Sequence, residues 1–285
     1  MIKLGILKSP GGKSSSKPMH SSALSNLGID GEYTVYECLP KDLKKTFDEL
    51  KRNKVRGVNV TIPHKIPVMS FVDRISERAK LIGAVNTVIF EEDGKSTGEN
   101  TDMHGFWNAI PKDIREQAKG KDVALLGAGG AACACAVAFI QNEVKTLKIY
   151  ARDINKLKAF KNELETKNIK SQTKIEIDLL ENIDLNNTFI LTNTTPIGMY
   201  PNSNSSPVKL EDLKKIPQDS LVYDIVYNPF ETVLLKDARS LGYKTLNGVE
   251  MLVLQGAESL KMWLNRNDVP VNVMREAVIT SLRAE

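Results

Sequence analysis

Cysteine, histidine and aromatic residues are scarce in this chain of 285 residues, and these shortages exclude two classes of protein. The three cysteines, Cys38, Cys133 and Cys135, are odd in number and lack the spacing of a disulfide framework, which excludes a small disulfide-stapled secreted protein. No cluster of Cys and His residues has the spacing of zinc ligands, so no metal site is predicted. Cys133 and Cys135 lie in a small, apolar run and are expected to pack a helix against a sheet.

Long apolar runs and blocks of one charge are also missing. The longest apolar run is about half of what a membrane span needs, and the N-terminus is too interrupted for a signal peptide. The 39 basic and 35 acidic residues leave a net charge of +4, and the lysines are scattered along the chain. Neither a membrane protein nor a nucleic-acid-binding protein is indicated. The composition is that of a globular protein, which we expect in the cytoplasm.

Strand-like and helix-like segments alternate along the first part of the chain. Strands are expected at 3–7, 32–38 and 57–62, and helices at 19–27 and 43–53. A loop of Gly, Ser, Lys and Pro separates the first strand from the first helix. Strands separated by helices predict parallel βαβ units.

A second α/β system begins near residue 105. Strands are expected at 122–126, 147–151, 188–192, 220–225 and 244–246, and helices at 131–141 and 155–167. Two further helices, at 250–264 and 272–282, follow the last strand and could pack on either domain. The run Gly127-Ala128-Gly129-Gly130-Ala131-Ala132 fits the G-x-G-x-x-G/A pattern. It follows the first of these strands and opens a helix, which is the context that gives the pattern its meaning. Its glycines permit a tight turn and the close approach of a pyrophosphate to the free N–H groups of the helix. The second system is therefore predicted to be a dinucleotide-binding Rossmann domain.

The end of the next strand indicates which dinucleotide is bound. An NAD-selective enzyme usually has a carboxylate there, whereas this chain has Ala151. The guanidinium of Arg152, with Lys156 one turn later, suits a 2′-phosphate. Asp153 would repel that phosphate unless it serves as the cap of the following helix. NADP is favoured, and NAD stays open.

Six segments, in this order, resemble the shikimate dehydrogenase family. They are GVNVTIPHK at 57–65, IGAVNT at 82–87, GENTD at 98–102, NTTPIGM at 193–199, YDIVYNP at 223–229 and GVEMLVLQ at 248–255. The matches run from residue 5 to about 263, so together they are much more specific than any one segment.

The resemblance implies an NADP-dependent oxidoreductase of aromatic amino acid biosynthesis, which reduces the ring ketone of 3-dehydroshikimate to shikimate. Lys65 and Asp102 match the family's proton-handling pair, and a lysine is charged at neutral pH, as a proton donor to an alkoxide must be. The residues implied to bind substrate are Ser14, Ser16, Thr61, Asn86, Tyr227 and Gln255. Those implied to bind the cofactor are Gly127, Ala128, Gly129, Gly130, Ala131, Ala151, Arg152, Lys156, Ile225 and Gly248. His64 and His104 are expected to be structural.

The resemblance also implies the domain organisation, with two α/β domains. Residues 1–103 and 250–285 would form a mostly parallel, three-layer substrate-binding domain, and residues 104–249 the Rossmann domain. The protein is expected to be a monomer or a homodimer with a small-molecule substrate.

The loop 11–17 departs from the family's form, because Lys13 stands for its histidine and Lys17 for its proline. A quinate/shikimate or amino-shikimate dehydrogenase with broader substrate or NAD use is therefore an alternative. A non-catalytic NADP-binding regulator is an alternative of another class, against which the intact Lys65 and Asp102 count. Gly12-Lys13-Ser14 is similar to the end of a phosphate-binding P-loop, but Leu7 stands where that motif needs its first glycine.

Overall fold

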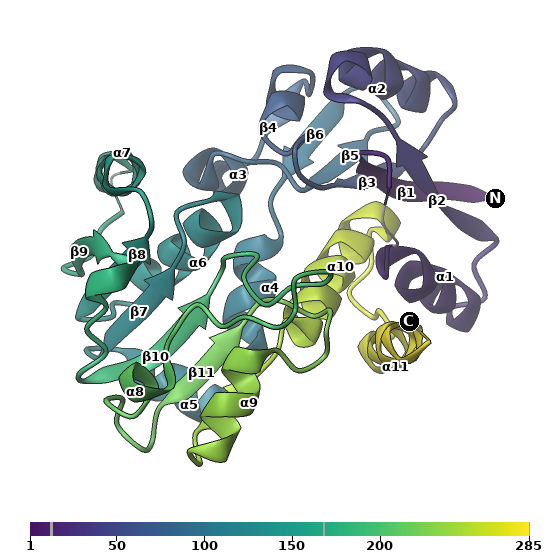
Figure 1. The fold of residues 1–285 in the computed structure, drawn as a ribbon. Coiled ribbons are helices and arrows are strands. Elements are labelled where there is room, and N and C mark those ends of the chain that lie inside the picture. Colours follow the sequence, from purple (N-terminus) through teal and green to yellow (C-terminus); the bar gives the residue numbers. More distant parts are fainter. Residues whose placement is uncertain (12–13, 168, 285) are drawn as a thin grey trace. The chain divides into compact units, whose positions relative to one another are not determined.

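The computed structural model describes residues 1–11, 14–167 and 169–284, which fall into two compact units. One unit comprises Met1–Gly105 and Leu252–Glu285, and the other comprises Phe106–Met251. Each unit has a six-stranded sheet with helices packed on it (Figure 1). Lys13, at which the loop departs from the family's form, lies outside the described residues.

The strands of the first unit are β1 (Ile2–Lys8), β2 (Gly31–Glu37), β3 (Gly57–Val60), β4 (Arg74–Ile75), β5 (Thr87–Phe90) and β6 (Ser96–Glu99). Its helices are α1 (Ser16–Asn26), α2 (Leu43–Arg52), α3 (Glu77–Ile82) and α11 (Val271–Arg283). The short 3-10 turns are η1 (Pro40–Asp42) and η2 (Pro67–Ser70). Helices α4 (Asp102–Ala109) and α10 (Val249–Leu264) contribute residues to both units.

The first sheet has the strand order β2-β1-β3-β5-β6-β4. Strand β1 is parallel to both β2 and β3, whereas β5 is antiparallel to β3 and to β6. From β1 the chain passes first to β2 on one side and then to β3 on the other side of β1. The carboxyl ends of β1 and β3 therefore form a topological switch point. Parallel α/β sheets bind their ligands at such points.

Helices cover both faces of the first sheet. Leu43, Phe47 and Leu50 of α2 join a core with Val58, Val60 and Val88 on one face. On the other face, Trp263 of α10 donates to Val88 O at 3.0 Å, and a Cβ on Gly57 would lie 2.0 Å from the Trp263 indole nitrogen. Figure 1 shows α1 and α11 beside α10, on the side of the sheet opposite α2. The unit thus has the three layers predicted.

The strands of the second unit are β7 (Asp122–Leu126), β8 (Thr146–Ala151), β9 (Lys174–Leu179), β10 (Thr188–Asn193), β11 (Leu221–Asp224) and β12 (Lys244–Leu246). Its helices are α5 (Lys112–Ala118), α6 (Gly130–Gln141), α7 (Ile154–Thr166), α8 (Leu210–Leu213) and α9 (Val233–Ser240), with the 3-10 turn η3 (Leu180–Asn182).

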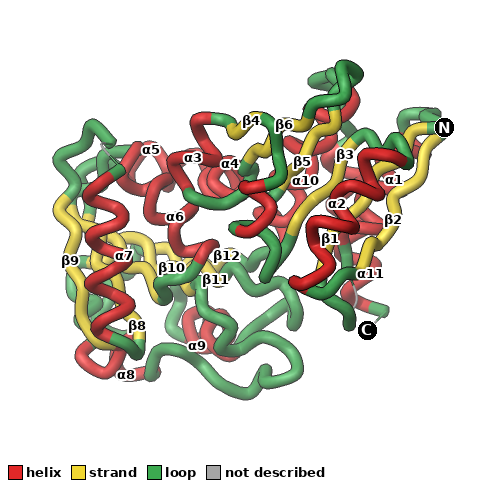
Figure 2. The backbone as a smooth tube through the Cα atoms, turned by 90° about the horizontal axis from the view of Figure 1, so that it is seen from above, coloured by secondary structure: helices red, strands yellow, loops and turns green. Residues whose placement is uncertain are grey.

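The second sheet is parallel, with the order β12-β11-β10-β7-β8-β9. This is the doubly wound dinucleotide-binding order, whose switch point lies between β7 and β10. Leu213 of α8 and Leu234 of α9 pack on one face of the sheet, and Phe139 of α6 belongs to the other, where it meets Phe106 of α4 edge-on. Figure 2 shows α7 running along β8 and β9. The predicted fold class, two α/β domains of which one is a Rossmann domain, is confirmed.

Several elements were not predicted, among them β4, β9, α5 and α9. Two further local differences have a clear cause. Helix α1 begins at Ser16 rather than near residue 19, because Pro18 is tolerated in a first turn, where its missing N–H would have no helical partner. The antiparallel hairpin of β5 and β6 is absent from the sequence predictions, although Asp93-Gly94 between the strands is a typical hairpin turn.

Candidate active site

Lys65 and Asp102 form an ion pair in the first unit. Lys65 Nζ lies 2.6 Å from Asp102 Oδ2, and the side chains are 20% and 10% exposed. Lys65 belongs to the turn that follows β3, and Asp102 is the first residue of α4, where helix N–H groups favour a carboxylate. A lysine held in this way still has N–H bonds to offer an oxygen atom of a ligand. The pair is therefore suited to general acid–base chemistry.

Asn86 and Gln255 are joined to this pair by hydrogen bonds. Asn86 Nδ2 lies 2.8 Å from Asp102 Oδ1 and 3.3 Å from Gln255 Oε1. Asn86 Oδ1 accepts a hydrogen bond from Thr101 N at 2.8 Å, and Gln255 Nε2 donates to Leu252 O at 2.9 Å. Four predicted site residues, each from a different segment of the chain, are thus joined by hydrogen bonds.

A buried polar network that was not predicted supports these residues. Ser259 Oγ of α10 lies 2.8 Å from Thr87 Oγ1 and accepts a hydrogen bond from Asn59 Nδ2 at 3.0 Å. Asn59 Oδ1 in turn accepts a hydrogen bond from Tyr33 Oη at 2.8 Å. All four side chains are buried. The sequence did contain a signal for this network, because Asn59 and Thr87 are polar residues within apolar strands. A polar side chain buried in this way requires a hydrogen-bond partner.

The predicted carboxylate-binding serines lie on the segment that follows β1. Ser16 is buried at the start of α1. Burial raises the pKa of the Tyr33 phenol well above its usual value, so Tyr33 stays neutral. Ser14 is half-buried, and so is Thr61 directly after β3. Because β1 and β3 are adjacent and parallel, these residues share one edge of the sheet with Lys65.

In the second unit, the glycine turn after β7 has the shape of a phosphate-binding loop. Gly127 has a φ of +111°, and a Cβ there would lie 2.7 Å from Thr194 Oγ1, so the position requires glycine. A Cβ added at Gly129 or Gly130 would meet no atom within 4 Å. Gly129 caps α6 without a side chain, so the first N–H groups of this helix of 12 residues face open space. Ala128 and Ala131 complete the turn that the sequence predicts to bind a pyrophosphate.

Asp153 serves as the cap of α7, the role that the sequence left open. Its Oδ1 accepts hydrogen bonds from Asn155 N at 2.9 Å and from Lys156 N at 3.2 Å. Arg152 and Lys156 are exposed, and Ala151 is half-buried at the end of β8. Arg152 lines a pocket of about 400 Å³ near the carboxyl ends of β8 and β9. The helix N–H groups therefore engage the Asp153 carboxylate, and Arg152 supplies positive charge beside it.

Ile225 and Gly248 are in direct backbone contact. A Cβ on Gly248 would lie 1.9 Å from Ile225 O, and Gly248 N donates to Val226 O at 3.0 Å. Tyr227, two residues after Ile225, is half-buried and belongs to the second unit. The other residues predicted to bind substrate belong to the first unit.

Asn193 and Asp224 form a second buried polar group that was not predicted. Asn193 Nδ2 donates to Asp224 Oδ1 at 3.0 Å, and Thr232 Oγ1 donates to Asp224 Oδ2 at 2.7 Å. Burial raises the pKa of Asp224 to about 6, although these hydrogen bonds and one from Val226 N oppose the rise. The pair joins the carboxyl ends of the neighbouring strands β10 and β11.

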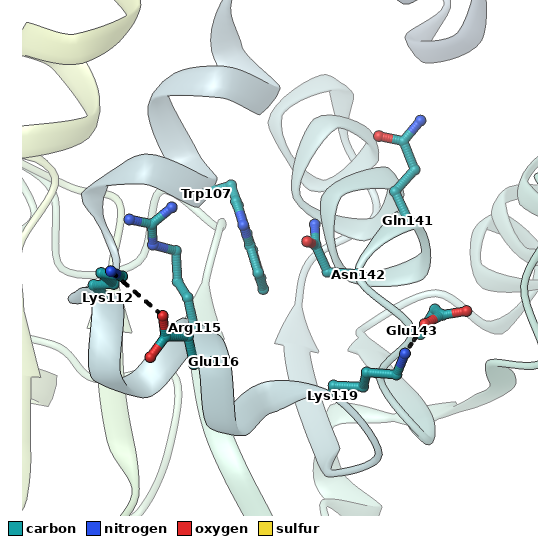
Figure 3. A pocket seen from close by; sticks show the side chains of 8 residues that line it. All are labelled: Trp107, Lys112, Arg115, Glu116, Lys119, Gln141, Asn142 and Glu143. Carbon is teal, nitrogen blue, oxygen red and sulfur yellow. Dashed lines mark ion pairs between the residues drawn. The ribbon is translucent and has the colours of Figure 1, made fainter.

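Another pocket of about 430 Å³ lies at the amino ends of β7 and β8 (Figure 3). In Figure 3, Trp107 stands between Arg115 of α5 and Asn142, and ion pairs join Lys112 to Glu116 and Lys119 to Glu143. This edge of the sheet is opposite the glycine turn, and none of the predicted site residues lines the pocket.

The remaining candidate groups have structural surroundings. His64 is buried with Nε2 3.1 Å from Cys38 O, and His104 Nε2 lies 3.8 Å from Glu258 Oε2. Cys133 and Cys135 are buried in α6, as expected, and burial raises the pKa of Cys133 to about 12. Among the described residues, no group of three or more His, Cys, Asp or Glu side chains is placed to hold a metal ion. In the same part of the chain, every helix is too short or too polar to cross a membrane.

Comparisons with known proteins identify the family. The model of the shikimate dehydrogenase substrate binding domain matches residues 6–88, and that of the shikimate 5'-dehydrogenase C-terminal domain matches residues 248–279. A shikimate dehydrogenase (NADP(+)) of Methanocaldococcus jannaschii is 40% identical over 281 residues, which cover 98% of this chain and 96% of the relative.

Solved structures match nearly the whole chain. A shikimate dehydrogenase in complex with NADP+ superimposes with a TM-score of 0.89 at 38% identity, covering 99% of this chain and 96% of that one. A ligand-free 5-ketofructose reductase of a Gluconobacter strain superimposes with a TM-score of 0.88 at 31% identity, covering 98% of both chains. The resemblance seen in the six segments is confirmed, and the chain belongs to the shikimate dehydrogenase family of oxidoreductases.

Proposed function

We propose that this protein catalyses the reversible NADPH-dependent reduction of 3-dehydroshikimate to shikimate, a step of aromatic amino acid biosynthesis. The observation that carries the proposal is the Lys65–Asp102 ion pair, hydrogen-bonded through Asn86 to Gln255 at the ligand-binding edge of a parallel sheet. NADP is the cofactor printed in the names of the relative and of a solved structure described above.

The geometry assigns a separate task to each polar group. Lys65 donates a proton from Nζ to the ring oxygen as the ketone becomes an alkoxide, and it takes the proton back in the reverse direction. Asp102 holds the ammonium group in place through Oδ2, while Asn86 holds Asp102 through Oδ1. NADPH, when bound, supplies the hydride. Fixing the carboxylate at both oxygens keeps Lys65 aimed at one point, which lowers the entropic cost of reaching the transition state.

Substrate binding is assigned to groups that both donate and accept hydrogen bonds. Ser14 and Ser16 bind the substrate carboxylate, and Thr61, Asn86, Tyr227 and Gln255 bind ring oxygens or the carboxylate. The unit that contains β1–β6 is the substrate-binding domain, in agreement with the family model that matches residues 6–88.

The second unit is the cofactor-binding domain. The backbone of Gly127–Ala131 and the N-terminus of α6 bind the pyrophosphate, where added Cβ atoms at Gly129 and Gly130 would meet nothing. Arg152 and Lys156 bind the 2′-phosphate, and Ala151, Ile225 and Gly248 line the rest of the site. We also propose a cytoplasmic location and a monomeric or homodimeric state.

The deciding experiment follows the loss of NADPH absorbance when 3-dehydroshikimate is added. Lys65→Met should lower kcat by roughly 10²- to 10⁴-fold, because it removes the proton donor but keeps the length of the side chain. The matched control is Lys44→Met, which breaks an exposed 2.6 Å ion pair with Asp48 and should leave kcat unchanged. Full activity of Lys65→Met would refute the role of Lys65 as proton donor, whereas no loss of NADPH with the unaltered protein would favour a non-catalytic NADP-binding protein.

Parallel assays with dehydroquinate, an amino-substituted ring ketone and 5-ketofructose, each also with NADH in place of NADPH, test the alternatives. The altered loop 11–17 motivates the ring analogues, and the likeness to a 5-ketofructose reductase motivates the open sugar. A higher kcat/KM for any of these than for 3-dehydroshikimate would replace the proposed substrate while keeping the reaction type.

A further inference from the structure

Lys8 and Glu37 form a partly buried ion pair at the ends of neighbouring strands. They are register partners at the last residues of β1 and β2, and Lys8 Nζ lies 3.0 Å from Glu37 Oε1. Lys8 is only 8% exposed, and a lysine is seldom buried unless its charge is paired. The pair lies where the chain leaves β1 towards Ser14 and Ser16.

Both members of the pair also bind the backbone of Gly11. Lys8 Nζ donates a hydrogen bond to Gly11 O, and Gly11 N donates one to Glu37 Oε1 at 3.3 Å. Gly11 has a φ of +91°, a conformation that side-chain-bearing residues rarely adopt. The ion pair thus engages both polar groups of one loop residue. The hydrogen bonds from Lys8 and Gly11 keep the pKa of Glu37 below its usual value, so its carboxylate stays charged.

Ser16, on the other side of Ser14, is the first residue of α1 and is buried. Lys17 N donates a hydrogen bond to Ser14 O at 3.4 Å, so Ser14 is joined to the first turn of this helix. The ion pair thus holds Gly11 on one side of the two serines, and α1 holds the serines on the other side. Each of these hydrogen bonds restricts the conformations open to the backbone that it engages.

We propose that Lys8 and Glu37 are positioning residues that hold the loop after β1 so that Ser14 and Ser16 meet the substrate carboxylate. The inference rests on the proposed function for the roles of the two serines. Lys8 and Glu37 act through the loop rather than through their charges, because a positive and a negative group 3.0 Å apart nearly cancel for a ligand further away. Loss of either member loosens the loop and weakens binding of the substrate, but leaves the chemical step intact.

The two variants Lys8→Met and Glu37→Gln separate positioning from simple charge attraction. Lys8→Met should raise the KM for 3-dehydroshikimate roughly tenfold, with kcat and the KM for NADPH unchanged, because one charge-assisted anchor is lost. Glu37→Gln leaves the Lys8 charge unbalanced. Simple attraction of an anion would then lower the substrate KM, whereas positioning requires that it rise. A lower KM in Glu37→Gln would overturn the proposal.

A second readout keeps this inference separate from the identity of the substrate. Deuterium uptake at the amides of Gly11 and of Ser14–Ser16 should be faster in Lys8→Met than in the unaltered protein, and unchanged in the control Lys80→Met, which breaks an exposed pair with Glu77. If the unaltered protein does not reduce 3-dehydroshikimate, the proposed function is wrong. Deuterium uptake then remains as the test of whether Lys8 and Glu37 hold Gly11. Unchanged deuterium uptake in Lys8→Met would refute the positioning role of Lys8, whichever substrate the enzyme uses. The double variant Lys8→Met/Glu37→Gln, which leaves no unpaired buried charge, distinguishes loop loosening from general unfolding.

Discussion

Asn59 and Ser259 are hydrogen-bonded to each other, Nδ2 to Oγ at 3.0 Å, across 200 residues of sequence. Asn59 belongs to β3 and Ser259 to α10, one turn beyond Gln255. The bond therefore attaches the helix that carries Gln255 to the strand that leads to Lys65. Because Ser259 also bonds with Thr87, its hydroxyl connects two strands and a helix at the base of the candidate site.

Replacing Ser259 by alanine should lower the free energy of unfolding by about 1–3 kcal/mol, because the substitution leaves Asn59 and Thr87 buried with one partner fewer. Chemical denaturation measures the loss. The matched control is Ser240→Ala, whose hydroxyl donates to Asp237 O at an exposed position and whose removal should cost less than about 0.5 kcal/mol. Equal, small losses in both variants would mean that the Ser259 hydroxyl contributes nothing to the network.

The glycine turn allows a paired test of fold and cofactor binding. Gly127→Ala should destabilise the protein by about 1 kcal/mol or more, because its φ is +111° and its Cβ would lie 2.7 Å from Thr194 Oγ1. Gly129→Ala meets no atom within 4 Å and has an ordinary φ of −108°, so the melting temperature should not fall.

Gly129→Ala should nevertheless weaken NADPH binding about tenfold or more, a loss of roughly 1.4 kcal/mol, because the new methyl group occupies the space assigned to the pyrophosphate. Titration of NADPH fluorescence measures this dissociation constant. Unchanged affinity would place the cofactor elsewhere.

Arg152 should determine the preference for NADPH over NADH. Arg152→Ala should raise the KM for NADPH by about 10-fold or more and leave that for NADH nearly unchanged, because only NADPH carries the phosphate that the guanidinium binds. Asp153→Asn is the companion variant: it retains a helix cap and removes one negative charge, so NADPH should bind more tightly and the fold should be unaffected. A parallel change for both cofactors in Arg152→Ala would contradict the assignment.

Asp224 should make the stability of the protein depend on pH. Burial raises its pKa from 3.8 to about 6, so between these values the folded state holds a proton that the unfolded state releases. The bound proton stabilises the folded state fully at a pH below 3.8, and this stabilisation is lost as the pH rises through about 6. The loss amounts to at most about 3 kcal/mol, since one pKa unit corresponds to roughly 1.4 kcal/mol.

The measurement is the difference in unfolding free energy between the unaltered protein and Asp224→Asn, taken from pH 4 to pH 7. This difference should fall as pH rises, because asparagine cannot titrate. A difference that stays constant over the range would show that Asp224 keeps an ordinary pKa in the folded state.

Much of the architecture and most of the candidate site followed from local sequence signals. The glycine turn at 127–131 was predictable because backbone sterics and helix N–H groups act within a few residues. Lys65, Asp102, Asn86 and Gln255 were found through segments that resemble a known family, and the structure brings these four together. The hairpin of β5 and β6 was missed although its turn was readable.

Only the tertiary structure decided which groups these side chains form hydrogen bonds with. No local pattern indicates that Asn59 bonds with Ser259, that Lys8 and Glu37 share Gly11, or that Asp153 faces its own helix rather than a ligand. Periodicity and backbone sterics depend on neighbours along the chain, so the sequence by itself determined the elements and the fold class. Hydrogen bonds between distant side chains depend on strand order, register and helix packing, and these are settled only when the whole sheet forms.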